Sequence, residues 1–144
     1  MSWRHAGAVF VMAALPDTPE NSPEDRSMLT PFMQTLQAII NAHENPFVLI
    51  NENYQVVAAN AAYQHTHGVK ESQIVGRYCY EISHHRKSPC SQHGEDCPHE
   101  QVFVHARDCQ MLHTHYDRHG QAEHVQIKGY VIPQPDGSKL LAES

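Results

Sequence analysis

Positive charge is scarce in this sequence, and no stretch of the chain is rich in lysine or arginine. Ten Lys and Arg residues stand against 16 Asp and Glu residues, which gives a formal net charge of −6. Nucleic-acid-binding surfaces need clustered basic side chains to contact phosphates. The composition therefore argues against direct binding to DNA or RNA.

Long apolar runs are also missing. No segment approaches the roughly 20 apolar residues of a membrane-spanning helix. Residues 6–15 are apolar and follow Arg4, but Pro16 and an acidic stretch come next in place of a signal-peptide cleavage site. We therefore expect a cytoplasmic protein that has no membrane contact.

Familiar catalytic and cofactor-attachment motifs are absent as well. The sequence has no H-E-x-x-H, no phosphate-binding glycine loop and no nucleophile elbow. It also lacks C-x-x-C-H, the attachment motif of c-type haem, which argues against a covalent haem. We expect a binding protein and not an enzyme.

The chain divides into an N-terminal arm with a linker, residues 1–27, and one domain, residues 28–144. Residues 16–27 are rich in Pro, Ser and acidic side chains, which is typical of a linker. An amphipathic helix is predicted over 29–43, with apolar residues at helical spacing, namely Leu29, Phe32, Met33, Leu36, Ile39 and Ile40. Pro46 ends it.

The rest of the domain alternates between short strands and short helices. Strands are predicted at 47–50 and 54–59, then helical segments at 61–67, 71–75, 77–83 and 99–106, around a Cys-His-Pro loop at 84–97. Three further strands are predicted at 109–117, 123–132 and 138–142, with turns at 118–120 and 135–137. This order predicts an α+β fold, a five-stranded antiparallel sheet with short helices on one face and an N-terminal amphipathic helix.

Local sequence supports the same fold. The stretch NPFVLINENYQVVAANAAYQHTHGVKESQIVGRYCYEI, with Asn60, Gly68 and Gly76, resembles the opening of PAS sensor domains. The closing stretch HTHYDRHGQAEHVQIKGYVIPQPDGSKLL resembles the last three strands of that family. The resemblance covers about residues 33–142.

The resemblance implies a sensory role. PAS domains have an internal pocket that holds haem, flavin, a small metabolite or nothing. They often dimerise through the helix before the first strand and act on a histidine kinase, cyclase or transcription activator. The flavin-adduct motif of the light-sensing branch, of the Asn-Cys-Arg-Phe-Leu type, is missing here, which disfavours a flavin adduct.

Cysteine and histidine are concentrated in one part of the chain. Nine of the 13 histidines lie between His84 and His124, together with three of the four cysteines. The predicted metal ligands are Cys79, His84, Cys90 and Cys97, three thiolates and one imidazole, a set that suits zinc or an iron–sulfur centre. Cys109, His85 and His93 are alternative fourth ligands.

The pattern CYE…H…PC…CP resembles a bacterial PAS subset that shares this Cys/His cluster. The other interpretations are structural or redox-active thiols, and an oxidised pair of cysteines. His113 and His115 lie two apart on a predicted strand and therefore share a face. Such a pair can bind a metal or a haem edge, line the ligand pocket, or form a solvated or hydrogen-bonded face, and we name both as candidates for the ligand pocket. His65, His67, His119 and His124 are predicted to lie on the surface.

These observations lead to two hypotheses. The first is a sensory module whose Cys/His loop binds metal and responds to redox state, oxygen or the metal itself, in a homodimer coupled to an effector. The alternative is a small-molecule-binding or purely dimerising PAS module with no metal.

Overall fold

The structure is a computed structural model, and it describes residue 31 and residues 34–144. The predicted arm and linker at 1–27, and part of the first half of the predicted N-terminal helix, lie outside the described residues.

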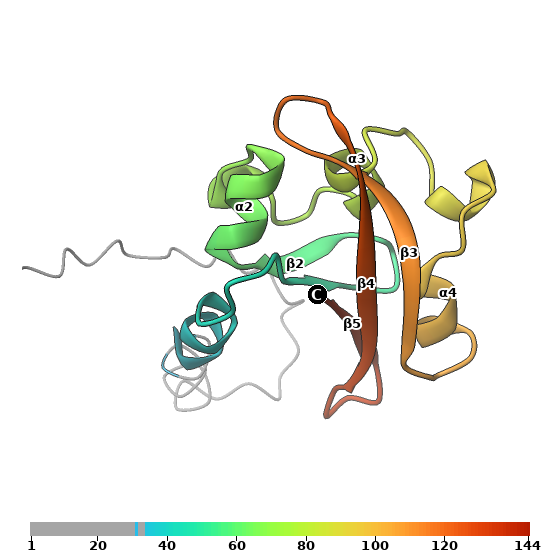
Figure 1. The fold of residues 1–144 in the computed structure, drawn as a ribbon. Coiled ribbons are helices and arrows are strands. Elements are labelled where there is room, and N and C mark those ends of the chain that lie inside the picture. Colours follow the sequence, from blue (N-terminus) through green and yellow to red (C-terminus); the bar gives the residue numbers. More distant parts are fainter. Residues whose placement is uncertain (1–30, 32–33) are drawn as a thin grey trace, which may run out of the picture.

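Five antiparallel strands form one sheet in the order β2-β1-β5-β4-β3 (Figure 1). The first two, β1 (Val48–Ile50) and β2 (Val56–Ala59), pair with each other with a register irregularity at Leu49/Ile50. The last three are β3 (Cys109–Tyr116), β4 (Ala122–Pro133) and β5 (Lys139–Glu143). The last strand, β5, pairs with both β1 and β4, and it therefore joins the β1–β2 hairpin to β3 and β4 in one sheet.

Short helices connect the two parts of the sheet. They are α2 (Ala61–His67), the 3-10 turn η1 (Glu71–Gln73), α3 (Cys79–Ser83), the 3-10 turn η2 (Cys90–His93) and α4 (Pro98–Phe103). Tyr63 of α2, Ile82 of α3 and Val102 of α4 share one apolar core with β-strand residues such as Val48 and Leu141. Burial of this apolar surface holds the helices on one face of the sheet.

The opposite face of the sheet has its own smaller core. A helix at 34–41, drawn in blue-green in Figure 1, places Ile40 against Leu49, Ala58 and Ala142. Neighbouring strand residues alternate between the two cores because successive side chains point to opposite faces. The five-stranded sheet with short helices confirms the predicted fold.

Most element boundaries agree with the sequence prediction within a few residues. The prediction for α2 is correct at both ends, since Asn60 caps Tyr63 N and Gly68 takes the left-handed conformation. Two expectations were wrong: the 84–97 loop contains the turn η2, and His67 is buried, not on the surface. The helix α2 turns His67 toward the sheet, four positions after Tyr63 on the same helical face.

Within residues 31 and 34–144, no helix has the length and apolar character needed to cross a bilayer.

Candidate metal centre and pocket

Three side chains from three separate segments meet beneath the Cys-His loop. His84 ends α3, Cys90 begins η2 and His113 lies on β3. One ligand atom from each lies within 4.8 Å of the others. The three residues are only 3–4 % exposed, so the group is shielded from solvent.

The backbone of the loop explains how two of these residues reach the sheet. Helix α3 ends at His84, and His85 has φ 51°, which reverses the chain. Pro89 precedes Cys90, and Gly94 at φ 79° turns the chain back toward α4. Because a left-handed conformation costs little for glycine, Gly94 suits this second reversal.

His113 is oriented by a partner outside the group. Its Nε2 contacts the carbonyl oxygen of Asp96, which can only accept a hydrogen bond, so Nε2 carries the proton. Its Nδ1 is buried and has no hydrogen-bond partner among the described residues. This nitrogen is therefore free to donate its lone pair to a ligand.

An acidic side chain, Glu95, lies next to His84. His84 Nδ1 lies 3.8 Å from Glu95 Oε2, and the other carboxylate oxygen of Glu95 lies 3.2 Å from Arg86 Nη2. Carboxylate or carbonyl groups commonly orient metal-binding histidines through hydrogen bonds. Here the Asp96 carbonyl does so for His113, while the Glu95 carboxylate lies near His84 at a distance longer than a hydrogen bond.

Cys90 and Cys97 interact directly. The hydrogen bond with the Cys97 side chain lowers the pKa of the Cys90 thiol, and His84 lowers it further. The same contact and burial raise the pKa of Cys97. Cys90 is thus the more acidic thiol of the pair.

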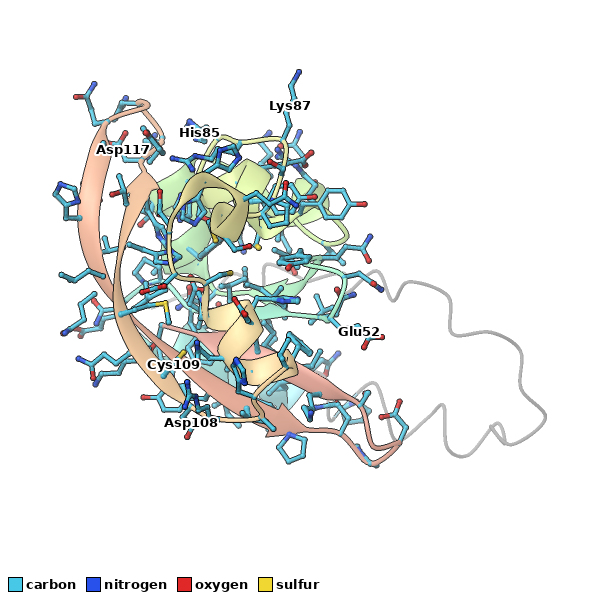
Figure 2. The ribbon with its side chains drawn as sticks, turned by 90° about the vertical axis from the view of Figure 1, so that its right-hand side faces the viewer. Glu52, His85, Lys87, Asp108, Cys109 and Asp117 are labelled. Carbon is cyan, nitrogen blue, oxygen red and sulfur yellow. The ribbon has the colours of Figure 1, made fainter. Side chains whose placement is uncertain are left out.

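The remaining candidates of the sequence analysis lie outside the grouping. Cys79 packs against the main apolar core, and burial raises the pKa of its thiol. Cys109 faces Gly129 at the end of β3 near α4, whereas His85 lies at the opposite end of the molecule (Figure 2). His93 is bound to the Ser88 hydroxyl, 2.8 Å away, and the His85 ring stacks on Tyr116.

The structure therefore brings together His84 and Cys90 of the predicted set and adds His113. Cys97 contacts Cys90 at the edge of this group, and Cys79 lies outside it. The alternation H-x-H on the predicted strand was the available signal for His113. This pattern predicts that the two histidines share a face of the strand, but it does not show which segment of the chain that face contacts.

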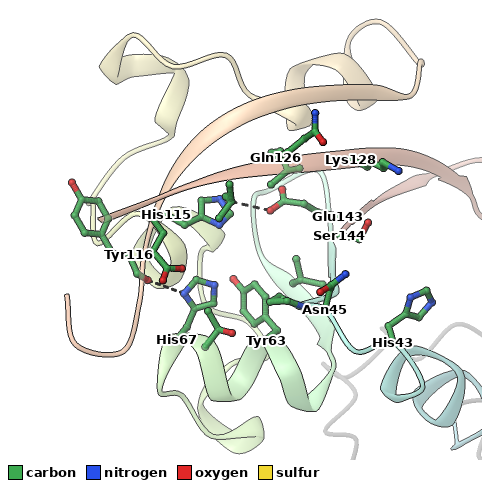
Figure 3. Close-up of a pocket in the computed structure, with 16 residues that line it drawn as sticks. His43, Asn45, Tyr63, His67, His115, Tyr116, Gln126, Lys128, Glu143 and Ser144 are labelled. Atoms are coloured by element: carbon green, nitrogen blue, oxygen red, sulfur yellow. Dashed lines mark hydrogen bonds and ion pairs between the residues drawn. The ribbon is translucent and has the colours of Figure 1, made fainter. Parts of the chain in front are cut away.

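A pocket of about 540 Å³ lies beside this grouping, between α2, residues 43–46 and strands β3–β5 (Figure 3). His115 lines the pocket and also packs edge-on against His84, with ring centroids 4.9 Å apart. Among the two histidines predicted for a pocket, His115 lines this one, while His113 turns to the Cys-His group. Glu143 and His67 also line it.

Burial shapes the ionisation of the pocket residues. It raises the pKa of Glu143 to about 7, and it lowers the pKa of His115 to about 2 and that of His67 below its usual value. His115 Nε2 lies 4.0 Å from Glu143 Oε1, beyond hydrogen-bond distance.

The donor set of the grouping fits a transition metal. Two imidazoles and one thiolate are ligands that zinc accepts, and a fourth position is left for Cys97 or another ligand. An iron–sulfur centre with two histidines needs two cysteines, so it would require Cys97 as well.

Comparison with known proteins identifies the family. The sequence pattern described as PAS fold matches residues 41–142, most of the chain, so this chain belongs to the PAS family of sensor domains. The comparison with curated proteins gave no match.

Three solved structures illustrate the likeness. The PAS domain of Bordetella pertussis BvgS has a TM-score of 0.53 at 15 % identity, covering 78 % of this chain and 82 % of that one. The PAS domain of nitrogen regulation protein NR(II) from Vibrio parahaemolyticus has a TM-score of 0.58 at 15 % identity, covering 75 % and 94 %. The Rhodobacter sphaeroides LOV protein has a TM-score of 0.60 at 15 % identity, covering 80 % and 65 %. At these identities the likeness shows a shared fold and nothing further.

Proposed function

We propose that this PAS domain is a sensory module of a bacterial signalling protein, and that His84, Cys90 and His113 bind a metal. The signal would be the presence of the metal or the oxidation of the site that holds it. Zinc is the first candidate and an iron–sulfur centre the second. The observation that carries the proposal is the buried Cys90 thiol beside two buried imidazoles, of which His113 is oriented by the carbonyl oxygen of Asp96 and His84 has the Glu95 carboxylate 3.8 Å from its Nδ1.

The position of these residues suggests how such a signal would act. A metal bound by all three would tie the 84–97 loop to β3, which otherwise meets it only through side-chain packing and the Asp96 contact. Metal loss, or oxidation of the Cys90 thiolate, would remove this link. The loop and α4 would then be free to move relative to the sheet.

The remaining parts of the proposal follow from the family. We expect a cytoplasmic homodimer that acts through a histidine kinase, cyclase or transcription activator, and no catalytic activity of its own. The solved PAS domains of a two-component histidine kinase and of NR(II) support such a setting by their fold.

The test is metal analysis of protein purified anaerobically without a His-tag. We expect one metal per chain in the wild type and its loss in Cys90→Ser and in His113→Ala. Cys109→Ser and His93→Ala are matched controls that should keep the metal. An assay for acid-labile sulfide separates zinc from an iron–sulfur centre.

One further variant, Cys79→Ser, distinguishes the ligand sets when it is compared with His113→Ala. If Cys79→Ser loses the metal while His113→Ala retains it, the set predicted from sequence alone is correct and the proposed set is wrong. Metal-free wild-type protein with freely alkylated Cys90 would contradict metal binding altogether.

A second candidate function, a small-molecule sensor without metal, is favoured by the pocket of about 540 Å³ beside α2. Its volume lies within the range of small-molecule sites.

A further inference from the structure

The pocket beside α2 has a carboxylate in it. Glu143 extends from β5 toward the centre of the pocket, and its side chain is 12 % exposed (Figure 3). Among the described residues, no hydrogen-bond donor reaches this carboxylate, and the nearest basic atom is His115 Nε2 at 4.0 Å. A carboxylate so placed gains from any donor that a ligand brings.

The neighbouring polar atoms are acceptors or lack partners. His67 Nδ1 lies 3.0 Å from the carbonyl oxygen of Tyr116, so Nδ1 carries the proton and Nε2 is left as an acceptor. His115 Nε2 is buried without a hydrogen-bond partner. Beside the Glu143 carboxylate, the pocket therefore offers one further defined acceptor, His67 Nε2, and the unpartnered Nε2 of His115.

Near Glu143, aromatic and apolar side chains line the pocket. The rings of Tyr63 and His67 pack with centroids 4.5 Å apart, and Val48 and Ile127 complete the lining near Glu143. Lys128 and Glu123 also line the pocket, but both are exposed. An apolar body with one cationic end matches such walls, since aromatic faces also attract cations.

We propose that this pocket binds a small organic amine, whose ammonium group pairs with Glu143 and whose apolar body packs against Tyr63. A ligand with a carboxylate at this end is disfavoured because it would face Glu143. The inference rests on the second candidate function, a small-molecule pocket, and does not depend on the metal.

Three probes of matched shape test the charge of the ligand. They are 2-phenylethylamine, 2-phenylethanol and phenylacetate, titrated into the full chain by isothermal calorimetry. We expect the amine to bind at least about tenfold more tightly than the alcohol, and the acid to bind least. Tighter binding of the alcohol or the acid would overturn the amine inference while leaving a small-molecule pocket in place.

Two variants test the residue. Glu143→Gln keeps the size of the side chain and should weaken amine binding at least about tenfold, with little change for the alcohol. Glu123→Gln removes an exposed carboxylate of the same pocket and should leave amine affinity within about twofold. Equal amine affinity in the wild type and Glu143→Gln would overturn the proposal, as would the absence of any heat with the amine.

The same samples keep the two proposals separate. Metal content is measured before each titration, so the amine result is obtained for protein of known metal occupancy. Loss of metal in His113→Ala together with unchanged amine binding would leave the amine inference intact.

Discussion

At the scale of single residues, Asn60 joins three parts of the fold. Its side chain is fully buried, accepts from the backbone of Tyr63 and Phe47, and donates to the carbonyls of Ile40, His43 and Asn45. One amide thus caps α2 and closes the end of the helix at 34–41. Only Asn and Gln carry an amide that accepts through its oxygen and donates through two N–H groups, and the shorter side chain of Asn is the one suited to the N-cap position.

We predict that Asn60→Ala lowers the free energy of unfolding by about 3 kcal/mol, since it removes a helix cap and leaves buried backbone groups unpaired. Urea denaturation followed by circular dichroism measures this. Asn41→Ala, at an exposed position that also accepts from a backbone amide, is the control and should cost less than about 1 kcal/mol. Similar losses in both variants would contradict the role assigned to Asn60.

The raised pKa of Glu143 predicts that the stability of the protein depends on pH. Burial raises this pKa from 4.5 to about 7, so the folded state holds this proton more tightly than the unfolded state. The favourable contribution is complete below about pH 4.5 and is lost as the pH rises through 7, with a size of roughly 3 kcal/mol at most. Glu143→Gln should remove this part of the slope.

Denaturation of both proteins between pH 4 and 8 provides the measurement. Glu123→Gln, at an exposed position on β4, should keep the wild-type slope. A Glu143→Gln variant with an unchanged slope would show that Glu143 titrates normally in the folded state.

At the scale of elements, β3, β4 and α4 are packed closely around Gly129. A methyl group at this position would lie 2.9 Å from Cys109 Sγ and 3.1 Å from both Leu141 Cδ1 and Pro98 Cβ. Glycine is therefore needed where the helix α4 approaches the sheet.

We expect Gly129→Ala to destabilise the protein by about 1–3 kcal/mol because the core around it is already filled. Adding Cys109→Ala should recover part of the loss, since it removes the nearest of the three atoms. Thermal melts of the two variants and of Gln126→Ala, an exposed control on the same strand, test this. A double variant less stable than the sum of its single changes would contradict the packing explanation.

Elements could be predicted from the sequence where their signals are local. Asn60 and Gly68 mark both ends of α2, and the alternation in β3 and β4 follows from the pleat of a strand. The buried position of His67 could not be predicted, because it depends on the sheet strand that α2 faces.

Only part of the candidate site could be predicted from the sequence, for the same reason. His84 and Cys90 lie in one loop, and their spacing drew attention to them. His113 reaches Cys90 from a strand 23 positions further along the chain, and Glu143 reaches the pocket from the last strand. Contacts of this kind depend on the order of strands in the sheet, and a short sequence motif does not predict that order.

At the scale of the whole molecule, the proposed metal site joins segments that are far apart in the unfolded chain. A metal that binds only the folded state stabilises it by RT ln(1 + [L]/Kd), which is about 2.7 kcal/mol at a free concentration one hundred times Kd. We predict this gain for Zn²⁺ added to metal-free protein, measured by denaturant melts. His113→Ala should show little gain and Cys109→Ser the full gain; an equal gain in all three proteins would indicate binding elsewhere.

One strand carries both His113 and His115, two residues apart and on one face of the sheet. The first belongs to the Cys-His group and the second lines the pocket proposed to bind an amine, so a shift of β3 along its own axis would displace side chains of both. Thermodynamic linkage then requires reciprocity: whatever factor a bound metal applies to the affinity for an amine, the amine applies to the affinity for the metal. With both proposed ligands, such a domain would respond to a combination of two chemical conditions.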